Sequence, residues 1–365
     1  MSMILRIVVL LTLYASRAQE DAAETIINGH MEHDWKIFIV MNNIVDATIC
    51  ANTIYDAFKL ASTPSRIYLN MHDEVHRQKT NRCIQRFCRM YRTECHSLLR
   101  LKRISATFRD RSGALGHAAR RHAAEARLST SSQRDSFVLS VDSDIVFTKN
   151  WDGILLENWL LTGNDMAILS VAPKAVEVRE ILHSSSLLHC SAHIVTPYLL
   201  AVVEYNTPTI KRNGNLLKFP VLQSQYSEKF FFGPISAILK VPSDPYIGYA
   251  TTGFEFARAS RFWTSGFDFY ALTKDVLFAR YNMDESIVLS SSSSFAESSY
   301  RRIRQLYGEW YGAFSEASRY WLGQKRSVRL WYQFARINPN ATYNESTKNQ
   351  FMCCDEDLKY VHYKL

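Results

Sequence analysis

Apolar and polar residues form two alternating patterns along the N-terminal half of the chain. Short apolar or alternating runs, which are typical of strands, occupy residues 36–41, 66–70, 101–108 and 137–141. The segments between them repeat apolar residues at helical spacing, and we expect helices at 54–61, 82–91 and 118–128. This regular succession of strand and helix predicts an α/β fold, with a mostly parallel sheet covered by helices.

The second half of the chain is less regular. Residues 167–171 form one more apolar run, and residues 175–265 mix short apolar runs with Pro, Gly and Ser, which predicts short strands and loops. The serine tract 290–294 has low complexity and is expected to be a mobile loop. Residues 300–333 are predicted to be helical and basic.

One predicted strand ends abruptly on two acids. The run 137–141 is followed directly by Asp142-Ser143-Asp144, with two carboxylates one residue apart. In a parallel sheet, ligands bind beyond the carboxyl ends of the strands. Alternate residues there can turn their oxygens toward one hard metal ion, and that ion would neutralise a diphosphate. The competing interpretation is an ordinary Asp-rich turn.

The composition is that of a globular protein, with 365 residues of which 47% are hydrophobic. One large domain or two modest ones would fit this length. Residues 77–134 carry fifteen Lys or Arg against three Asp or Glu, a local charge of +12. A solvated helix face explains most of these cations, and an anionic partner is the alternative. The stretch has no RNA- or DNA-binding signature, so nucleic acid is disfavoured as a partner.

Both ends of the chain indicate the secretory pathway. Residues 1–18 resemble a signal peptide, because a basic residue precedes the apolar stretch 7–14 and small residues follow it. That stretch is shorter than the roughly 20 residues of a membrane span, which favours cleavage over a short signal anchor. The anchor would associate the N-terminus with a membrane. Two glycosylation sequons, at Asn340 and Asn344, lie in the polar tail 336–365.

The seven cysteines could form disulfides in such a compartment, although their odd number leaves at least one without a partner in the chain. Cys83, Cys88 and Cys95, with His96, are the grouping that suggests zinc. Their spacings of five and seven residues lack the close cysteine pair of structural zinc sites, so a disulfide or simple burial is favoured.

Five motifs follow one another in the order of a known family. They are Asp142-Ser143-Asp144 with Phe147 and Trp151-Asp152, Leu169-Ser170-Val171-Ala172-Pro173, Val241-Pro242-Ser243-Asp244-Pro245, the run from Gly253-Phe254-Glu255 through Arg261, Trp263-Thr264 and Gly266 to Asp268-Phe269, and Gly323 with Arg326-Ser327. Together they resemble the polypeptide or hydroxyproline α-N-acetylglucosaminyltransferases, which carry the glycosyltransferase (GlcNAc) domain. The resemblance covers roughly residues 35–335.

This resemblance implies a GT-A-like, Rossmann-type domain at 35–335 with acceptor-side loops and a helical C-terminal region, between the segments 1–18 and 336–365. It implies transfer of GlcNAc from UDP-GlcNAc to a Ser, Thr or hydroxyproline hydroxyl of a polypeptide, with retention at the anomeric carbon, in the Golgi lumen. Sugar transfer builds negative charge on the leaving diphosphate, so the chemistry independently favours Mn²⁺ or Mg²⁺ on carboxylate ligands.

On the donor side, we expect Asp142 and Asp144 to hold the metal ion, with Asp142 also serving the nucleotide. Arg121, in the basic helix, is a candidate for binding a phosphate with its bidentate fork, and a surface arginine is the alternative. The resemblance assigns Asp46 to the nucleotide, as the aspartate of a Tyr-Arg-Asp element. It also assigns Asp244 to the substrate site.

On the acceptor side, Glu255 is the candidate for orienting the acceptor hydroxyl, and a salt bridge to Arg258 or Arg261 is the alternative. Asp268 is a candidate for hydrogen bonding the acceptor, and a turn or capping role is the alternative. Trp263 would either stack on the sugar or fill the core.

Three positions depart from the family pattern. Val45 replaces the arginine of the Tyr-Arg-Asp element, Phe254 replaces the first glutamate of Gly-Glu-Glu, and Ala279 stands near a late metal-binding histidine. They leave open a second hypothesis, a weakened or inactive transferase fold that serves as a partner or regulator. A third hypothesis is a haloacid-dehalogenase-type phosphatase with Asp142 as its nucleophile. The strand order and the lack of a later acidic pair disfavour that enzyme class.

Overall fold

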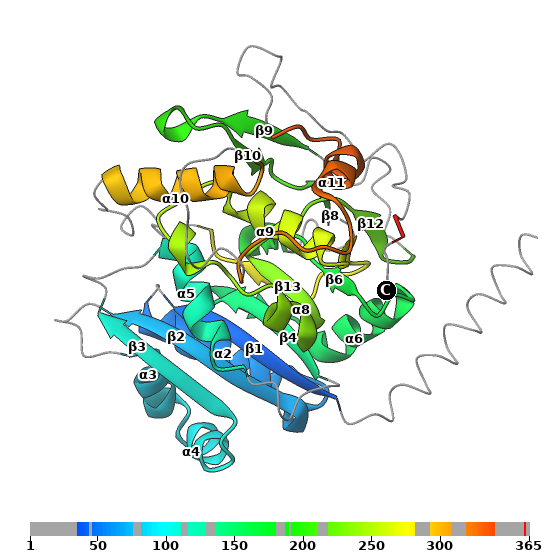
Figure 1. Ribbon diagram of the computed structural model, residues 1–365. Coiled ribbons are helices and arrows are strands. Elements are labelled where there is room, and N and C mark those ends of the chain that lie inside the picture. The colour runs from blue at the N-terminus through cyan, green and yellow to red at the C-terminus, as the bar shows by residue number, and fades with distance from the viewer. Residues whose placement is uncertain are drawn as a thin grey trace, which may run out of the picture.

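The computed structural model describes residues 35–43, 46–75, 82–110, 116–128, 136–179, 187–189, 191–210, 218–281, 293–308, 319–339 and 361–362. An eight-stranded sheet forms the centre, in the order β12-β14-β6-β13-β4-β1-β2-β3 (Figure 1). Its strands are β1 (Lys36–Asn43), β2 (Ile67–Val75), β3 (Ile104–Asp110), β4 (Ser136–Asp142), β6 (Ala167–Leu169), β12 (Val221–Gln223), β13 (Phe230–Pro234) and β14 (Asp268–Ala271).

Six of the eight strands run in one direction, because only β12 and β13 pair antiparallel with their neighbours. The predicted α/β class with a mostly parallel sheet is confirmed. The predicted order of strands and helices up to residue 142 is also confirmed, apart from one additional helix at Arg92–Arg100 that was not predicted.

Helices cover both faces of the sheet (Figure 1). One face packs against α2 (Ala47–Lys59), α3 (Cys83–Met90), α4 (Arg92–Arg100) and α6 (Trp151–Leu161). The other face packs against α5 (Gly116–Glu125), α8 (Ile235–Lys240), α9 (Phe254–Thr264), α10 (Ser293–Gln305) and α11 (Val328–Ala335). Successive side chains of a strand point to opposite faces, so within β1 Ile37 and Ile39 lie in the first core and Phe38 and Val40 in the second.

Smaller elements surround the main sheet. β5 (Ile145–Phe147), β15 (Leu277–Ala279) and β7 (Lys174–Ala175) form a three-stranded sheet. Two further pairs are β9 (Ala192–Val195) with β10 (Val202–Tyr205), and β8 (Leu187–Leu188) with β11 (Thr209–Ile210). The 3₁₀ turns are η1 (Pro64–Arg66), η3 (Val176–Val178), η4 (Pro197–Leu199) and η5 (Pro245–Ile247).

Several predicted boundaries need correction. The helix expected at 82–91 is α3, and the backbone breaks at Tyr91, with φ −126° and ψ 63°, before α4 begins. Ser293, from the serine tract, is the first residue of α10, while 290–292 lie outside the described residues. The single basic helix expected at 300–333 is wrong, because residues 319–327 are irregular and separate α10 from α11. The N-terminal segment 1–18 and both sequons lie outside the described residues.

Two disulfides join the helices on the first face of the sheet. Cys50 of α2 bonds to Cys83 of α3, and Cys88 of α3 bonds to Cys95 of α4. The preference for disulfides over zinc at these cysteines is confirmed. No helix within the described part of the chain has the length and apolar character needed to cross a membrane.

Candidate functional site

Asp142 is the last residue of β4, at the carboxyl edge of the parallel strands. The turn that follows is held by the neighbouring strand, because the Ser143 hydroxyl donates to Asn43 Oδ1 at 2.6 Å and the Ser143 N–H donates to the Asn42 carbonyl at 3.0 Å. On the far side, the Arg280 N–H donates to the Asp144 carbonyl at 3.1 Å. Both aspartates therefore lie on a turn whose backbone is fixed from two sides.

The Asp142 carboxylate is half-buried and ionised. Its Oδ1 accepts a hydrogen bond from Nη2 of Arg121 at 3.0 Å, and 23% of its side chain is exposed. Burial raises the pKa of this carboxyl, but the charges of Arg121 and His117 outweigh burial and hold the pKa below its ordinary value. Asp142 can therefore present a charged oxygen at the sheet edge at neutral pH.

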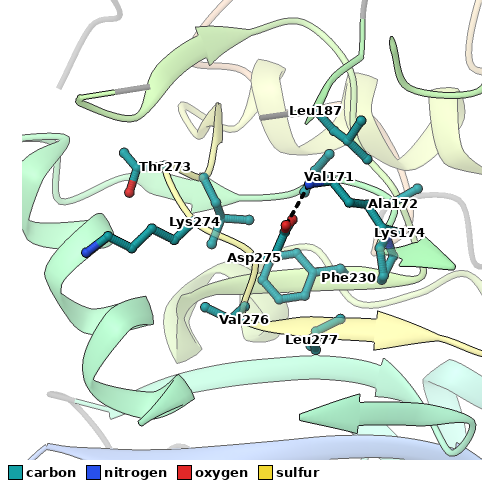
Figure 2. A pocket seen from close by; sticks show the side chains of 12 residues that line it. Val171, Ala172, Lys174, Leu187, Phe230, Thr273, Lys274, Asp275, Val276 and Leu277 are labelled. Carbon is teal, nitrogen blue, oxygen red and sulfur yellow. Dashed lines mark hydrogen bonds and ion pairs between the residues drawn. The ribbon is translucent and has the colours of Figure 1, made fainter. Parts of the chain in front are cut away.

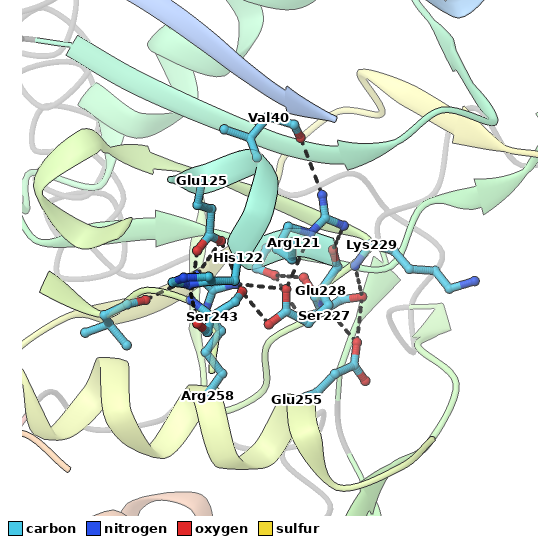
Figure 3. A network of polar contacts seen from close by, with 12 residues as sticks. Val40, Arg121, His122, Glu125, Ser227, Glu228, Lys229, Ser243, Glu255 and Arg258 are labelled. Atoms are coloured by element: carbon cyan, nitrogen blue, oxygen red, sulfur yellow. Dashed lines mark hydrogen bonds and ion pairs between the residues drawn. The ribbon is translucent and has the colours of Figure 1, made fainter. Parts of the chain in front are cut away.

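Arg121 is buried and contacts this carboxylate. Figure 3 shows its guanidinium beside the backbone of Val40. Its Nη1 donates to the Val141 carbonyl at 2.8 Å, and its Nη2 donates to the Glu228 carbonyl at 2.9 Å. None of the guanidinium is exposed. The prediction that Arg121 binds a phosphate is therefore wrong, since the fork is committed to the ends of the strands and to Asp142.

Arg121 is one member of a buried charge chain, which we define as Asp142, Arg121, Glu228, Arg258 and Glu125. Both oxygens of Glu228 accept from Nη1 of Arg258, at 3.1 and 3.0 Å, and Nη2 of Arg258 lies 2.6 Å from Oε1 of Glu125 (Figure 3). Burial by itself lowers the pKa of Arg258. The attraction of the two glutamates is larger, so the pKa lies above its ordinary value. The buried charge chain links β4, α5, the start of β13 and α9.

A close backbone approach places α5 so that Arg121 reaches this chain. The helix begins at Gly116, where φ is +72°. A Cβ at this position would lie 1.4 Å from the Gly248 carbonyl oxygen, so only glycine fits.

Glu255 lies beside the buried charge chain, in the first turn of α9. Its Oε1 accepts from the Glu228 N–H at 2.8 Å and from the Ser227 hydroxyl at 3.3 Å (Figure 3). Burial raises the pKa of Glu255 to about 7. The alternative of a salt bridge to Arg258 or Arg261 is wrong, because Arg258 pairs with the other two glutamates and Arg261 lies over the ring of Tyr320. Glu255 is thus a half-buried carboxyl that can exchange a proton near neutral pH.

Asp268 lies at the opposite edge of the sheet from Asp142. It is the first residue of β14, which runs in the same direction as β4. Its two oxygens accept from Nη1 and Nη2 of Arg326, at 2.7 and 3.0 Å, and the side chain is buried. The assignment of Asp268 to the acceptor site is wrong, and this residue instead anchors the segment before α11.

Two predicted substrate contacts also belong to the interior. Trp263 has no exposed surface and packs against Trp331 and Phe334, so its core role is the correct alternative. Asp244 is buried, caps η5 through the Tyr246 N–H at 3.0 Å and pairs with Arg302 at 2.7 Å. Both of its oxygens are used, and the assignment of Asp244 to the substrate is wrong.

Asp46 lies at the same edge as Asp142, in the connection after β1. Its carboxylate caps α2 by accepting from the Thr48 N–H at 2.7 Å, and this hydrogen bond lowers its pKa. The side chain is exposed. Its location is compatible with a nucleotide contact, and its observed contact is a helix cap.

Sequence reasoning missed Glu228 and His117. Glu228 lies two residues before the apolar run Phe230–Phe232, so a buried strand starting beside β4 was the available signal. His117 is half-buried in α5, where its ring centroid lies 5.3 Å from that of Phe254. Burial lowers the pKa of His117 to about 4, so its imidazole is neutral at pH 7.

The donor set at the turn suits a hard cation. Asp142 and Asp144 are both half-buried oxygen donors, and within the described residues no cluster of three His, Cys, Asp or Glu side chains could hold a metal ion. β15 passes beside the turn with Ala279 opposite Ile145, where the family pattern brings an imidazole. Two carboxylates match a cation of the Mn²⁺ or Mg²⁺ type that takes its other ligands from phosphate and water.

A pocket opens at the carboxyl ends of β6 and β14 (Figure 2). Its lining residues are Val171, Ala172, Pro173, Lys174, Leu187, Phe230, Leu272, Thr273, Lys274, Asp275, Val276 and Leu277. Lys174 and Asp275 form an ion pair of 2.6 Å in this wall. Because Phe230 pairs with Val141, the pocket borders the strand that carries Asp142.

Comparison with known proteins gives one family. The family described as Glycosyltransferase (GlcNAc) matches residues 88–341, more than half of the 365 residues. No curated protein matches the sequence. Among solved structures, similarity extends to GalNAc-T7 with UDP, GalNAc and Mn²⁺, at 10% identity and a TM-score of 0.48, over 74% of this chain and 48% of that one. It extends also to the mannosyltransferase PcManGT from Pyrobaculum calidifontis in complex with GDP-Man and Mn²⁺, at 8% identity and a TM-score of 0.41, over 76% and 68% of the two chains. The chain thus spans about half the length of GalNAc-T7.

Proposed function

Since the chain belongs to the glycosyltransferase (GlcNAc) family, we propose that it transfers GlcNAc from UDP-GlcNAc to a hydroxyl of a polypeptide, in a metal-dependent reaction. One observation carries the proposal. Asp142 stands ionised and partly exposed at the carboxyl end of β4, where α/β sheets bind their ligands.

On the donor side, Asp142 and Asp144 would hold Mn²⁺ or Mg²⁺. A bound cation supplies Lewis-acid stabilisation of the charge that develops on the leaving diphosphate. Arg121 keeps Asp142 ionised and oriented through the contact of 3.0 Å. Asp46, on the same edge, is the candidate for a further nucleotide contact.

On the acceptor side, Glu255 is the residue proposed to orient the acceptor hydroxyl. Its hydrogen bonds from Ser227 and from the Glu228 N–H fix one oxygen, and the second oxygen remains to accept a hydrogen bond from the hydroxyl. With a pKa of about 7, the carboxyl can also accept the hydroxyl proton near neutral pH. The proposed acceptors are Ser, Thr or hydroxyproline, with retention at the anomeric carbon.

The proposed setting is the secretory pathway, in the Golgi lumen. The two disulfides support this setting, because they persist in oxidising compartments. We further propose a signal peptide or short anchor at 1–18, a catalytic domain at 35–335 and a polar tail at 336–365.

Ligand-induced thermal stabilisation tests the proposal. UDP with Mn²⁺ should raise the melting temperature of the protein, since a ligand that binds only the folded state stabilises it by mass action. The Asp142→Asn variant should lose this rise, while Asp268→Asn, which changes a carboxylate at the opposite edge, should keep it. UDP-GlcNAc with Mn²⁺ should also yield free UDP. A wild-type protein that UDP and Mn²⁺ fail to stabilise would instead support the inactive-partner hypothesis.

A further inference from the structure

We infer that Glu228 and Arg258 are positioning residues, which keep Asp142 available to a metal–nucleotide complex and tie it to Glu255. This inference rests on the proposed function, because it concerns how the same site holds its metal. The sequence assigned neither residue a role at the metal site, and Arg258 was considered only as an ion-pair partner of Glu255.

Glu228 alone contacts both the donor side and the acceptor side of the site. Its carbonyl accepts from Arg121 at 2.9 Å, next to Asp142, and its N–H donates to Glu255 at 2.8 Å. Its carboxylate lies 3.8 Å from Nε of Arg121 and takes both short contacts from Arg258. A displacement of Glu228 would therefore move the donor-side and acceptor-side carboxylates together.

The buried charge chain has a net charge of −1. It contains three carboxylates and two guanidinium groups, all linked in sequence by ion pairs. Arg121 is shared between Asp142 and Glu228, so neither carboxylate alone neutralises it. If Glu228 loses its charge, Arg121 is opposed by Asp142 alone, and the chain becomes neutral overall. Asp142 would then attract a divalent cation less strongly.

Arg258 sets the position of Glu228. It bridges Glu228 to Glu125, and Glu125 in turn accepts from the Ser243 N–H at 2.8 Å and from the Ser243 hydroxyl at 3.1 Å. The planar fork of Arg258 contacts the two glutamates at once, whereas a lysine would reach only one point. Arg258→Lys therefore keeps the charge but loosens Glu228.

The test measures Mn²⁺ affinity directly, by the electron paramagnetic resonance of free Mn²⁺ in a titration of the full chain with UDP present. Glu228→Gln should weaken binding by about tenfold or more, the range found when groups that support metal ligands are changed. Arg258→Lys should weaken it by a smaller factor. Glu228→Asp, which keeps the charge, should bind more tightly than Glu228→Gln.

Asp268→Asn is the matched control. Like Glu228→Gln, it neutralises a buried carboxylate paired with an arginine, but at the opposite edge of the sheet. Its Mn²⁺ affinity should stay within about twofold of wild type although its stability falls.

If Glu228→Gln is folded and binds Mn²⁺ like wild type, the inference is overturned. If Glu228→Gln does not fold, Arg258→Lys is the test, and wild-type Mn²⁺ affinity in a folded Arg258→Lys protein overturns the inference. A wild-type protein that binds no Mn²⁺ with UDP overturns the proposed function instead.

Discussion

The raised pKa of Glu255 has a measurable consequence for stability. Burial, which disfavours the carboxylate, raises this pKa from 4.5 to about 7. The folded protein therefore holds the Glu255 proton more tightly than the unfolded chain, so between pH 4.5 and 7 this group makes the free energy of unfolding fall as the pH rises. At roughly 1.36 kcal/mol for each pKa unit, the loss is on the order of 3 kcal/mol across that window.

Two histidines act in the opposite direction and would hide this effect in the wild-type protein alone. Burial lowers the pKa of His117 and of His189 from 6.5 to about 4. Their folded forms release protons that the unfolded chain keeps, so stability rises with pH between about 4 and 6.5. The useful quantity is therefore the difference between wild type and Glu255→Gln, in which both histidine contributions cancel.

Glutamine suits this comparison because its side-chain oxygen can still accept from the Glu228 N–H, while it has no carboxyl to titrate. Urea unfolding at a series of pH values gives the free energy of unfolding for both proteins. Relative to wild type, Glu255→Gln should gain on the order of 3 kcal/mol between pH 4.5 and 7 and then level off. Parallel pH profiles for the two proteins would refute the argument that burial holds the Glu255 proton.

Three further predictions concern stability and binding. Asp268→Asn breaks a buried bidentate ion pair and should lower the free energy of unfolding by about 3–5 kcal/mol in urea titrations, with little effect on UDP–Mn²⁺ binding; unchanged stability would contradict the structural role. Trp263→Ala should cost about 3–5 kcal/mol by the same measurement, and a loss confined to ligand affinity would favour a substrate contact instead. Removing the Cys50–Cys83 disulfide, whose cysteines are 33 residues apart, should destabilise the protein by about 3–4 kcal/mol, and reducing agent should then have a smaller effect on that variant than on wild type.

The sequence by itself determined the class of fold and the location of the metal-binding candidates. The repeated succession of apolar strands and amphipathic helices is a local pattern, and it predicted the parallel part of the sheet. Parallel strands end at one edge, so the position of Asp142 at the end of β4 was enough to place it there. The preference for a disulfide or simple burial over zinc also came from the sequence, through the cysteine spacing and the expected secretory compartment.

Tertiary structure decided which of the remaining candidates reach that edge. Asp268 is close in sequence to Glu255, yet it begins a strand that runs parallel to β4 and so lies at the other edge, beside Arg326. Residues 121, 228 and 258 are far apart in the sequence, and only packing of α5 and α9 against the sheet brings their charges into contact. Burial and ion pairing depend on such distant neighbours, and a local pattern of residue types does not contain them.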